Sequence, residues 1–172
     1  MTIKTERLTL MPLTMEHLKS TCAYAMNSDN AKLMVYLPKS SEAEVAEFIK
    51  SAEAEWKKPQ PDFYELAVML DGRHIGGITM YFEGHFDRGE LGWIIHRDFQ
   101  GNGYAGEAAL GLIEYFKNKM GIRRFIAHCD SENSASKRVM EKLGMSLVEI
   151  HGGRFNRSSK EERLECLYEV IL

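Results

Sequence analysis

The residues of this sequence that most directly indicate a chemistry form a glycine-rich segment, residues 100–106, which reads QGNGYAG. The segment lies between a strand-like run, residues 91–96, and an amphipathic helical run. Glycines let backbone N–H groups turn inward at the start of a helix, where unpaired amides and the positive end of the helix dipole attract an anion. The segment therefore predicts a site for the phosphates of a cofactor.

The same segment also fits the dinucleotide-binding pattern G-x-G-x-x-G, through Gly101, Gly103 and Gly106. Asp130 even stands near the position of the acid that would bind a ribose. A dinucleotide-binding fold, however, places this turn directly after its first strand and needs several further strand–helix units. Here about half of the chain precedes the turn and too little follows it, which disfavours this interpretation.

Further motifs accompany the glycine-rich segment. Gln100, Gly103 and Ala105 fit a Q/R-x-x-G-x-G/A pyrophosphate loop, and residues 133–136 (NSAS) and 141–145 (EKLGM) fit a second signature, "N-x-x-S … e-K-l-G-F". With the opening TERLTL, residues 5–10, they resemble the GNAT superfamily of acetyl-coenzyme A dependent N-acetyltransferases. The opening is similar to the branch typified by bacterial ribosomal-protein N-terminal acetyltransferases. The sequence departs from the family pattern at Arg97-Asp98 and at Met145, positions that we do not expect to carry chemistry.

The resemblance implies direct transfer of an acetyl group from acetyl-coenzyme A to a primary amine, without a metal. It also implies that the pantetheine arm of the cofactor enters like an extra strand between two splayed strands of the central sheet. The cofactor-binding residues that it implies are Ile94, His96, Gln100, Gly101, Asn102, Gly103, Tyr104, Ala105, Asn133 and Ser136.

Acetyl transfer to an amine requires a base for the amine's proton, donors for the carbonyl oxygen and an acid for the thiolate. Glu90 precedes Gln100 by ten residues, and a similarly spaced glutamate is the base in some GNAT enzymes. A solvated carboxylate at a strand end, next to Arg88, is its alternative. His96 is an alternative base, although the resemblance assigns that position to cofactor binding through its backbone. Ser136 is the candidate acid, and an ordinary place in the first turn of a helix is its alternative. A non-catalytic acyl-coenzyme A sensor is the alternative function.

Two other groups of residues have weaker patterns. His74, Tyr81, Phe82 and His85 surround the expected hairpins and are candidates for the acceptor pocket, although such residues are more typical of packing or surface positions. The polar stretch that contains Arg154, Arg157 and Lys160 indicates a solvated loop, with the rim of the acceptor entrance as its other role.

Periodicity predicts the elements that must position these residues. Asp71-Gly72 is a strong signal for a two-residue hairpin turn, and Ser41, Gly121 and Asn133 or Ser134 are expected at helix ends. The expected helices cover residues 14–26, 41–56, 105–120 and 134–143, and the expected strands cover residues 7–11, 63–70, 73–82, 89–96, 124–128, 146–151 and 164–172. The fold class is therefore mixed α/β. The resemblance adds a mostly antiparallel, twisted sheet whose fourth and fifth strands splay apart.

Composition limits the remaining possibilities. A chain of 172 residues with 44% hydrophobic residues suits one domain, and we expect a single acetyltransferase domain over residues 1–172. A net charge of -3 argues against a nucleic-acid partner. Cys22, Cys129 and Cys166 have no metal-ligand spacing, and no apolar run approaches the roughly 20 residues that span a bilayer. We expect a cytoplasmic enzyme without metal or membrane partner that acts on a small-molecule amine or a protein N-terminus, with a homodimer left open.

Overall fold

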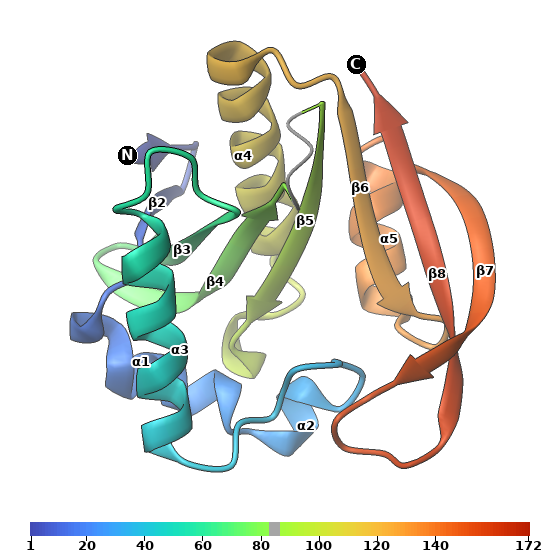
Figure 1. Ribbon diagram of the computed structural model, residues 1–172, viewed down its shortest axis with the longest axis horizontal. Coiled ribbons are helices and arrows are strands. Elements are labelled where there is room, and N and C mark those ends of the chain that lie inside the picture. Colours follow the sequence, from blue (N-terminus) through green and yellow to red (C-terminus); the bar gives the residue numbers. More distant parts are fainter. Residues whose placement is uncertain (83–86) are drawn as a thin grey trace.

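The computed structural model describes residues 1–82 and 87–172, so the candidate His85 lies outside the described residues. Its centre is a sheet with the strand order β1-β2-β3-β4-β5-β6-β8-β7 (Figure 1). The strands are β1 (Ile3–Lys4), β2 (Leu8–Pro12), β3 (Phe63–Leu70), β4 (Arg73–Tyr81), β5 (Arg88–Ile95), β6 (Arg124–Asp130), β7 (Ser146–Phe155) and β8 (Glu162–Ile171). Neighbouring strands are antiparallel, except for the parallel pair β5 and β6. The predicted mixed α/β fold with a mostly antiparallel sheet is confirmed.

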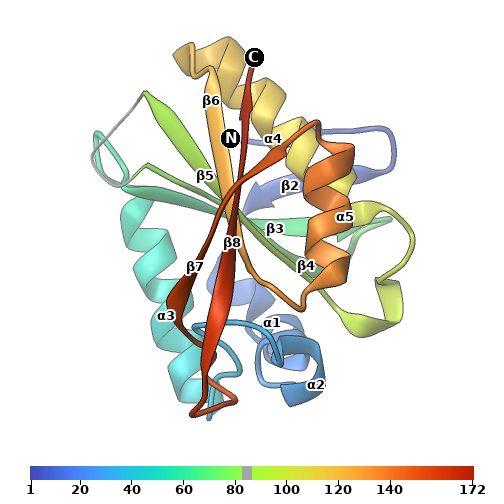
Figure 2. The same ribbon diagram turned by 90° about the vertical axis from the view of Figure 1, so that its right-hand side faces the viewer.

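Helices cover both faces of the sheet (Figure 2). They are α1 (Leu18–Ala25), α2 (Ser28–Ala31), α3 (Glu42–Glu55), α4 (Tyr104–Met120) and α5 (Ser134–Lys142), with short 3-10 turns at Met15–His17 and Arg97–Phe99. On one face, Leu112 and Phe116 of α4 pack in a core cluster with Phe125 of β6. On the other face, Val45 and Ile49 of α3 pack in a separate cluster. The sheet thus separates an α4–α5 side from an α1–α3 side.

Local sequence signals account for several turns and helix ends. Asp71 and Gly72 have φ angles of 48° and 78°, which fits the predicted two-residue hairpin turn. The Ser41 hydroxyl accepts a hydrogen bond from the Glu44 amide at the start of α3, and Gly121 ends α4 with φ of 71°. The two-residue strand β1 and the single-turn helix α2 were not predicted, because elements this short carry too few residues to establish a period.

The strands β5 and β6 are paired only at one end. Their register joins Arg88–Glu90 to Arg124–Ile126, and in the part of the chain that the structure describes the two strands do not pair beyond it. From this apex the two strands diverge, as Figure 1 shows. These are the fourth and fifth of the strands expected from the sequence, so the expected splay occurs where it was predicted.

The close approach of β4 and β5 depends on Gly76. A Cβ atom at this position would lie 2.2 Å from the Ile94 carbonyl oxygen. We expect Gly76→Ala to lower the free energy of unfolding by about 2 kcal/mol, measured by urea denaturation, because backbone cannot yield as a flexible side chain can. Gly106→Ala is the control, since a Cβ there meets nothing within 4 Å. Equal stability of the two variants would contradict the prediction.

Candidate active site

The start of α4 presents a group of unpaired backbone donors. Gly101 and Gly103 have φ angles of 80° and 83°, a left-handed conformation that favours glycine. Within the described residues, the backbone N–H groups of residues 101–106 make no hydrogen bond, and Glu107 is the first to donate, to the Gly103 carbonyl at 3.1 Å. These amides stand at the positive end of a helix of 17 residues. This arrangement suits a phosphate or pyrophosphate group.

The N-terminal segment supports this loop from behind. The Arg7 guanidinium forms an ion pair with Glu107 (Nε–Oε2 2.7 Å), donates to the Asn102 carbonyl at 3.1 Å, and stacks 4.6 Å from the centre of the Tyr104 ring. Thr5 also donates to Glu107. The TERL motif therefore positions the glycine-rich loop and the first turn of α4. The motif was recognised in the sequence, but this role was not predicted.

Side chains of the loop also maintain its shape. Gln100 Nε2 donates to the Ile95 carbonyl at 2.9 Å and to Asn30 Oδ1 at 3.1 Å. Asn102 Nδ2 donates to the carbonyls of Phe99 and Gln100, each at 3.1 Å. Because these amide side chains bond within the protein, the backbone N–H groups are the donors that the loop offers to a ligand.

The direction of the β5 backbone groups follows from two hydrogen bonds. The His96 amide donates to the Ile75 carbonyl on the β4 side at 2.8 Å, whereas the Ile95 carbonyl points the other way, toward Gln100. Alternation along the strand therefore turns the backbone of Ile94 and His96 toward β4 and that of Trp93 and Ile95 toward the gap. The cofactor residues expected from the sequence thus include Ile94 and His96, whose backbone faces β4, and leave out Trp93 and Ile95, whose backbone faces the gap. This alternation is fixed only when both neighbouring strands are known.

The apex of the gap holds an acid and an imidazole. Glu90 on β5 and His128 on β6 are joined by a hydrogen bond of 2.9 Å between Oε1 and Nδ1, and their side chains are 27% and 26% exposed. The hydrogen bond to Glu90 raises the pKa of His128, against the opposing effect of burial. His128 was not among the predicted residues. His96, the alternative base, lies six residues further along the chain than Glu90, roughly 20 Å for an extended strand.

A buried ionic network lies beyond His128 at the end of β6. Asp130 accepts hydrogen bonds from Arg163 and from Asn156 Nδ2 (2.6 Å), and Arg154 pairs with Glu165. Burial opposes ionisation of Asp130, but these hydrogen bonds outweigh it and lower its pKa to about 2. Because Asp130 is buried and both of its carboxylate oxygens bond to side chains of this chain, it is not placed to bind a ribose.

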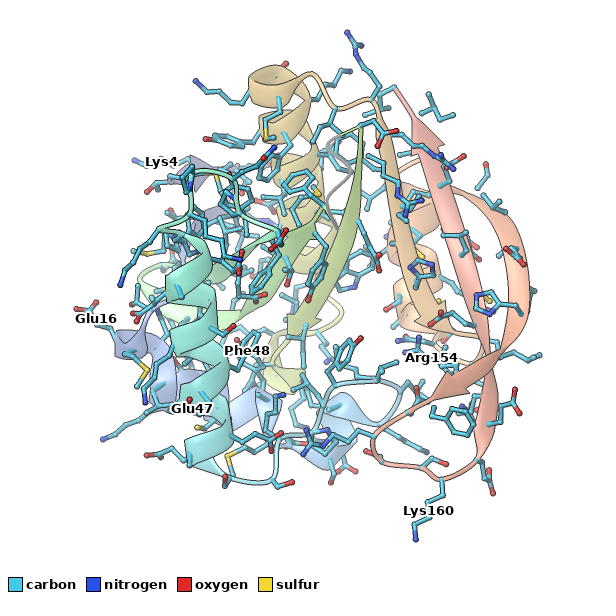
Figure 3. All side chains as sticks on the ribbon, in the orientation of Figure 1. Lys4, Glu16, Glu47, Phe48, Arg154 and Lys160 are labelled. Carbon is cyan, nitrogen blue, oxygen red and sulfur yellow. The ribbon has the colours of Figure 1, made fainter. Side chains whose placement is uncertain are left out.

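The prediction of a solvated loop was wrong for Arg154. This residue lies in β7, and 9% of its surface is exposed. The polar residues around Arg154 suggested exposure. Arg154 is buried nonetheless, because the fold places Glu165 and Asp130 beside its charge. Figure 3 shows Arg154 on the inner side of the β7–β8 hairpin and Lys160 at its tip, directed away from the protein.

The same hairpin bonds to the segment between α2 and α3, residues 32–41, which we call the strap. Arg154 Nη2 donates to the Leu33 carbonyl at 2.9 Å, and the Arg157 amide donates to the Met34 carbonyl at 3.0 Å. The Arg157 guanidinium reaches Ser40 and Glu44. The strap and the hairpin therefore lie side by side below the diverging ends of β5 and β6 (Figure 1).

A second glutamate is buried on β3, two strands away from Glu90 in the sheet. Glu65 on β3 is 5% exposed, faces Thr79 on β4 in register and accepts a hydrogen bond from its hydroxyl. Burial raises the pKa of Glu65 to about 8. Glu65 is therefore mostly neutral at pH 7 and adds little negative charge. Its position in the apolar run of residues 63–70 was a signal that sequence analysis left unused.

Asn133 and Ser136 lie together at the start of α5. The Asn133 side chain accepts a hydrogen bond from the Ser136 amide at 3.0 Å, as an N-cap residue does. Within the described part of the chain, the Ser136 hydroxyl makes no hydrogen bond. That hydroxyl is consequently available to a ligand.

The remaining candidates separate in space. Tyr81 stands opposite Glu90 in the β4–β5 register, whereas Phe82 is 1% exposed and packs against Phe116 in the α4 core. His74 hydrogen-bonds Ser20 and the Gly76 carbonyl, and burial lowers its pKa to about 4. Of these candidates, only Tyr81 adjoins the apex. Over residues 1–82 and 87–172, no cluster of three metal-ligating side chains occurs, and no helix has the length and apolarity to cross a membrane.

Comparison with known proteins identifies the family. The family described as "Acetyltransferase (GNAT) domain" matches residues 7–146. The chain belongs to the GNAT acetyltransferase family. The acetyltransferase is 30% identical over 147 residues to the uncharacterized N-acetyltransferase YnaD of Bacillus subtilis, which covers 84% of this chain and 82% of that protein.

Solved structures agree with this assignment. A GNAT-family acetyltransferase from Bacillus anthracis superposes on the acetyltransferase with a TM-score of 0.87 at 26% identity, over 99% of this chain and 98% of that chain. RimL, a ribosomal-protein alpha-N-acetyltransferase solved with coenzyme A, gives a TM-score of 0.89 at 16% identity, over 100% and 98% of the two chains. The first relation supports the family, and the second shows the shared fold.

Proposed function

We propose that the acetyltransferase moves the acetyl group of acetyl-coenzyme A directly to a primary amine, and that residues 1–172 form one domain for this purpose. The observation that carries the proposal is the position of unpaired amides at the start of α4, beside a gap whose apex holds Glu90 and His128. The amides suit the pyrophosphate, and the unpaired edges of β5 and β6 offer backbone hydrogen-bond partners to an extended pantetheine. The acetyl thioester would then lie near a basic pair.

The acceptor is proposed to be a cationic amine that reaches the gap from the α1–α3 side. The Glu90 carboxylate lies there, and an amine with an ordinary pKa arrives as ammonium. The Glu90–His128 pair removes its proton, the nitrogen attacks the thioester carbon, and the C–S bond breaks. The thiolate leaves beside Ser136. The likeness to RimL suggests a protein N-terminus, and small amines form the second class of acceptor.

An acetyl-transfer screen tests this function. Free amines, amino acids, aminoglycosides and N-terminal peptides are offered with acetyl-coenzyme A, and released thiol and acetylated product are both measured. We expect product from at least one amine class, in equal amount to the thiol. Tight binding of acetyl-coenzyme A without transfer to any amine would favour a sensor instead.

Ser136→Ala should lower the rate of acetyl transfer in single turnovers up to about tenfold, with little change in cofactor affinity. General acid catalysis contributes roughly 100-fold or more in many enzymes, but water can replace a hydroxyl here. Ser134→Ala is the matched control in the same helix turn, because Ser134 is exposed. Equal rates of acetyl transfer in the two variants would show that Ser136 has no catalytic role and is an ordinary residue of the first helix turn.

A further inference from the structure

The Glu90–His128 pair contains two groups that could accept a proton, and its geometry distinguishes them. This inference rests on the proposed function and concerns which atom acts as the base. A carboxylate only accepts hydrogen bonds, so the 2.9 Å bond requires the hydrogen to lie on Nδ1 of His128. In the neutral imidazole, Nε2 then carries the lone pair.

The second ring nitrogen is free. Within residues 1–82 and 87–172, Nε2 of His128 makes no hydrogen bond, and about a quarter of the side chain is exposed. Glu90 Oε1 is already engaged by Nδ1. His128 belongs to the same face of β6 as Ile126 and Asp130, opposite to Phe125, Ala127 and Cys129, which pack into the α4 core. The imidazole therefore lies on the acceptor side of the sheet.

The charges around His128 favour its protonated form. Glu90 acts from β5 and Glu165 from β8, whereas Arg154 from β7 opposes them. Arg154 is itself paired with Glu165, and His151 of β7 stands 3.7 Å from the same carboxylate. Tyr81 faces Glu90 from β4, and burial raises the pKa of its hydroxyl, so it remains neutral. The imidazolium would be stabilised chiefly by its direct bond to Glu90.

We propose that Nε2 of His128 takes the proton from the acceptor ammonium and that Glu90 is a positioning residue, which fixes the tautomer and orientation of the imidazole. The freed amine forms the C–N bond to the acetyl carbon. As the adduct collapses, the C–S bond breaks, and the second amine proton passes to the departing thiolate. The imidazolium returns the first proton to solvent. The products are the acetylated amine, coenzyme A thiol and one released proton.

Two variants separate the roles in single-turnover rates measured across pH. The oxygen of glutamine can still accept from Nδ1, so Glu90→Gln should preserve most of the rate at pH 8 and move the acidic limb of the profile to lower pH. His128→Asn removes the base, and the rate should fall about 100-fold with loss of that limb. His151→Asn is the control, expected to keep the limb.

Nitrogen NMR of the histidines gives a readout that needs no acceptor. We expect the hydrogen of neutral His128 on Nδ1, and a lower His128 pKa in the Glu90→Gln variant. Hydrogen on Nε2, or a parent-like rate and profile in the His128→Asn variant together with loss of the limb in Glu90→Gln, would overturn the assignment to His128. A parent protein that acetylates no amine would instead refute the proposed function, and the base assignment with it.

Discussion

Gly103→Glu is expected to raise the dissociation constant for acetyl-coenzyme A at least about 100-fold in a protein that still folds. The residue has φ of 83° and is exposed at the start of α4, where unpaired amides would hold the pyrophosphate. Glutamate would introduce a side chain and a negative charge at this place. Isothermal calorimetry measures the affinity, and circular dichroism checks the fold.

Gly121→Glu provides the matched control for this effect. Gly121 has φ of 71° at the far end of the same helix, and no atom within 4 Å of an added Cβ. The two substitutions share the conformational cost of roughly 1–2 kcal/mol but differ in their distance from the loop. The Gly121 variant should bind the cofactor like the parent. If a folded Gly103→Glu variant bound acetyl-coenzyme A as tightly as the parent, the assignment of the pyrophosphate to this loop would be wrong.

Asp130→Ala is expected to lower the free energy of unfolding by about 4 kcal/mol at pH 7. The carboxylate is fully buried and accepts hydrogen bonds from Arg163, Asn156 and the Glu132 amide. Removing it leaves buried donors and a positive charge without their partner, which is costly. Urea denaturation measures the difference. The exposed Asp62, which pairs with Lys58, is the control, and Asp62→Ala should change stability within about 0.5 kcal/mol.

The effect of Asp130 should depend on pH in a defined direction. Its pKa is lowered to about 2 in the folded protein, from an ordinary value near 3.8. A depressed carboxyl pKa contributes stability that is complete above the unfolded value and is lost as the pH falls toward the folded value. The difference between parent and variant should therefore be constant from pH 5 to 7 and shrink between pH 4 and 2. A difference that grew in acid would contradict this account.

Local features of the fold could be predicted because each is specified by adjacent residues. The Asp71-Gly72 turn, the Ser41 and Asn133 caps and the end of α4 at Gly121 all depend on residues a few positions apart. The glycine-rich loop and the TERL opening gave the family for the same reason. The resemblance, rather than periodicity, supplied the splay of the two strands.

The missed features are pairs of residues that are distant in sequence. His128 gains its importance from Glu90, 38 residues away, and nothing near it in the chain marks it as part of a site. From the sequence alone Arg154 is expected to be exposed, because only the fold brings its partners, Glu165 and the Leu33 carbonyl, beside it. Such pairings arise from strand order, which a single sequence does not specify.

The short ladder between β5 and β6 has a mechanical consequence. Strands β1 to β5 form one set of hydrogen-bonded neighbours and β6, β8 and β7 another. Among residues 1–82 and 87–172, the sheet joins the two sets only through Arg88–Glu90 and Arg124–Ile126. The ladder can therefore act as a hinge, because widening the angle between the halves breaks none of the hydrogen bonds inside either half. The bonds from Arg154 and Arg157 to the strap oppose such opening at the far end. These polar contacts add to the Glu90–His128 bond across the gap and to the core cluster that α4 shares with both halves, which together hold the two halves at their resting distance.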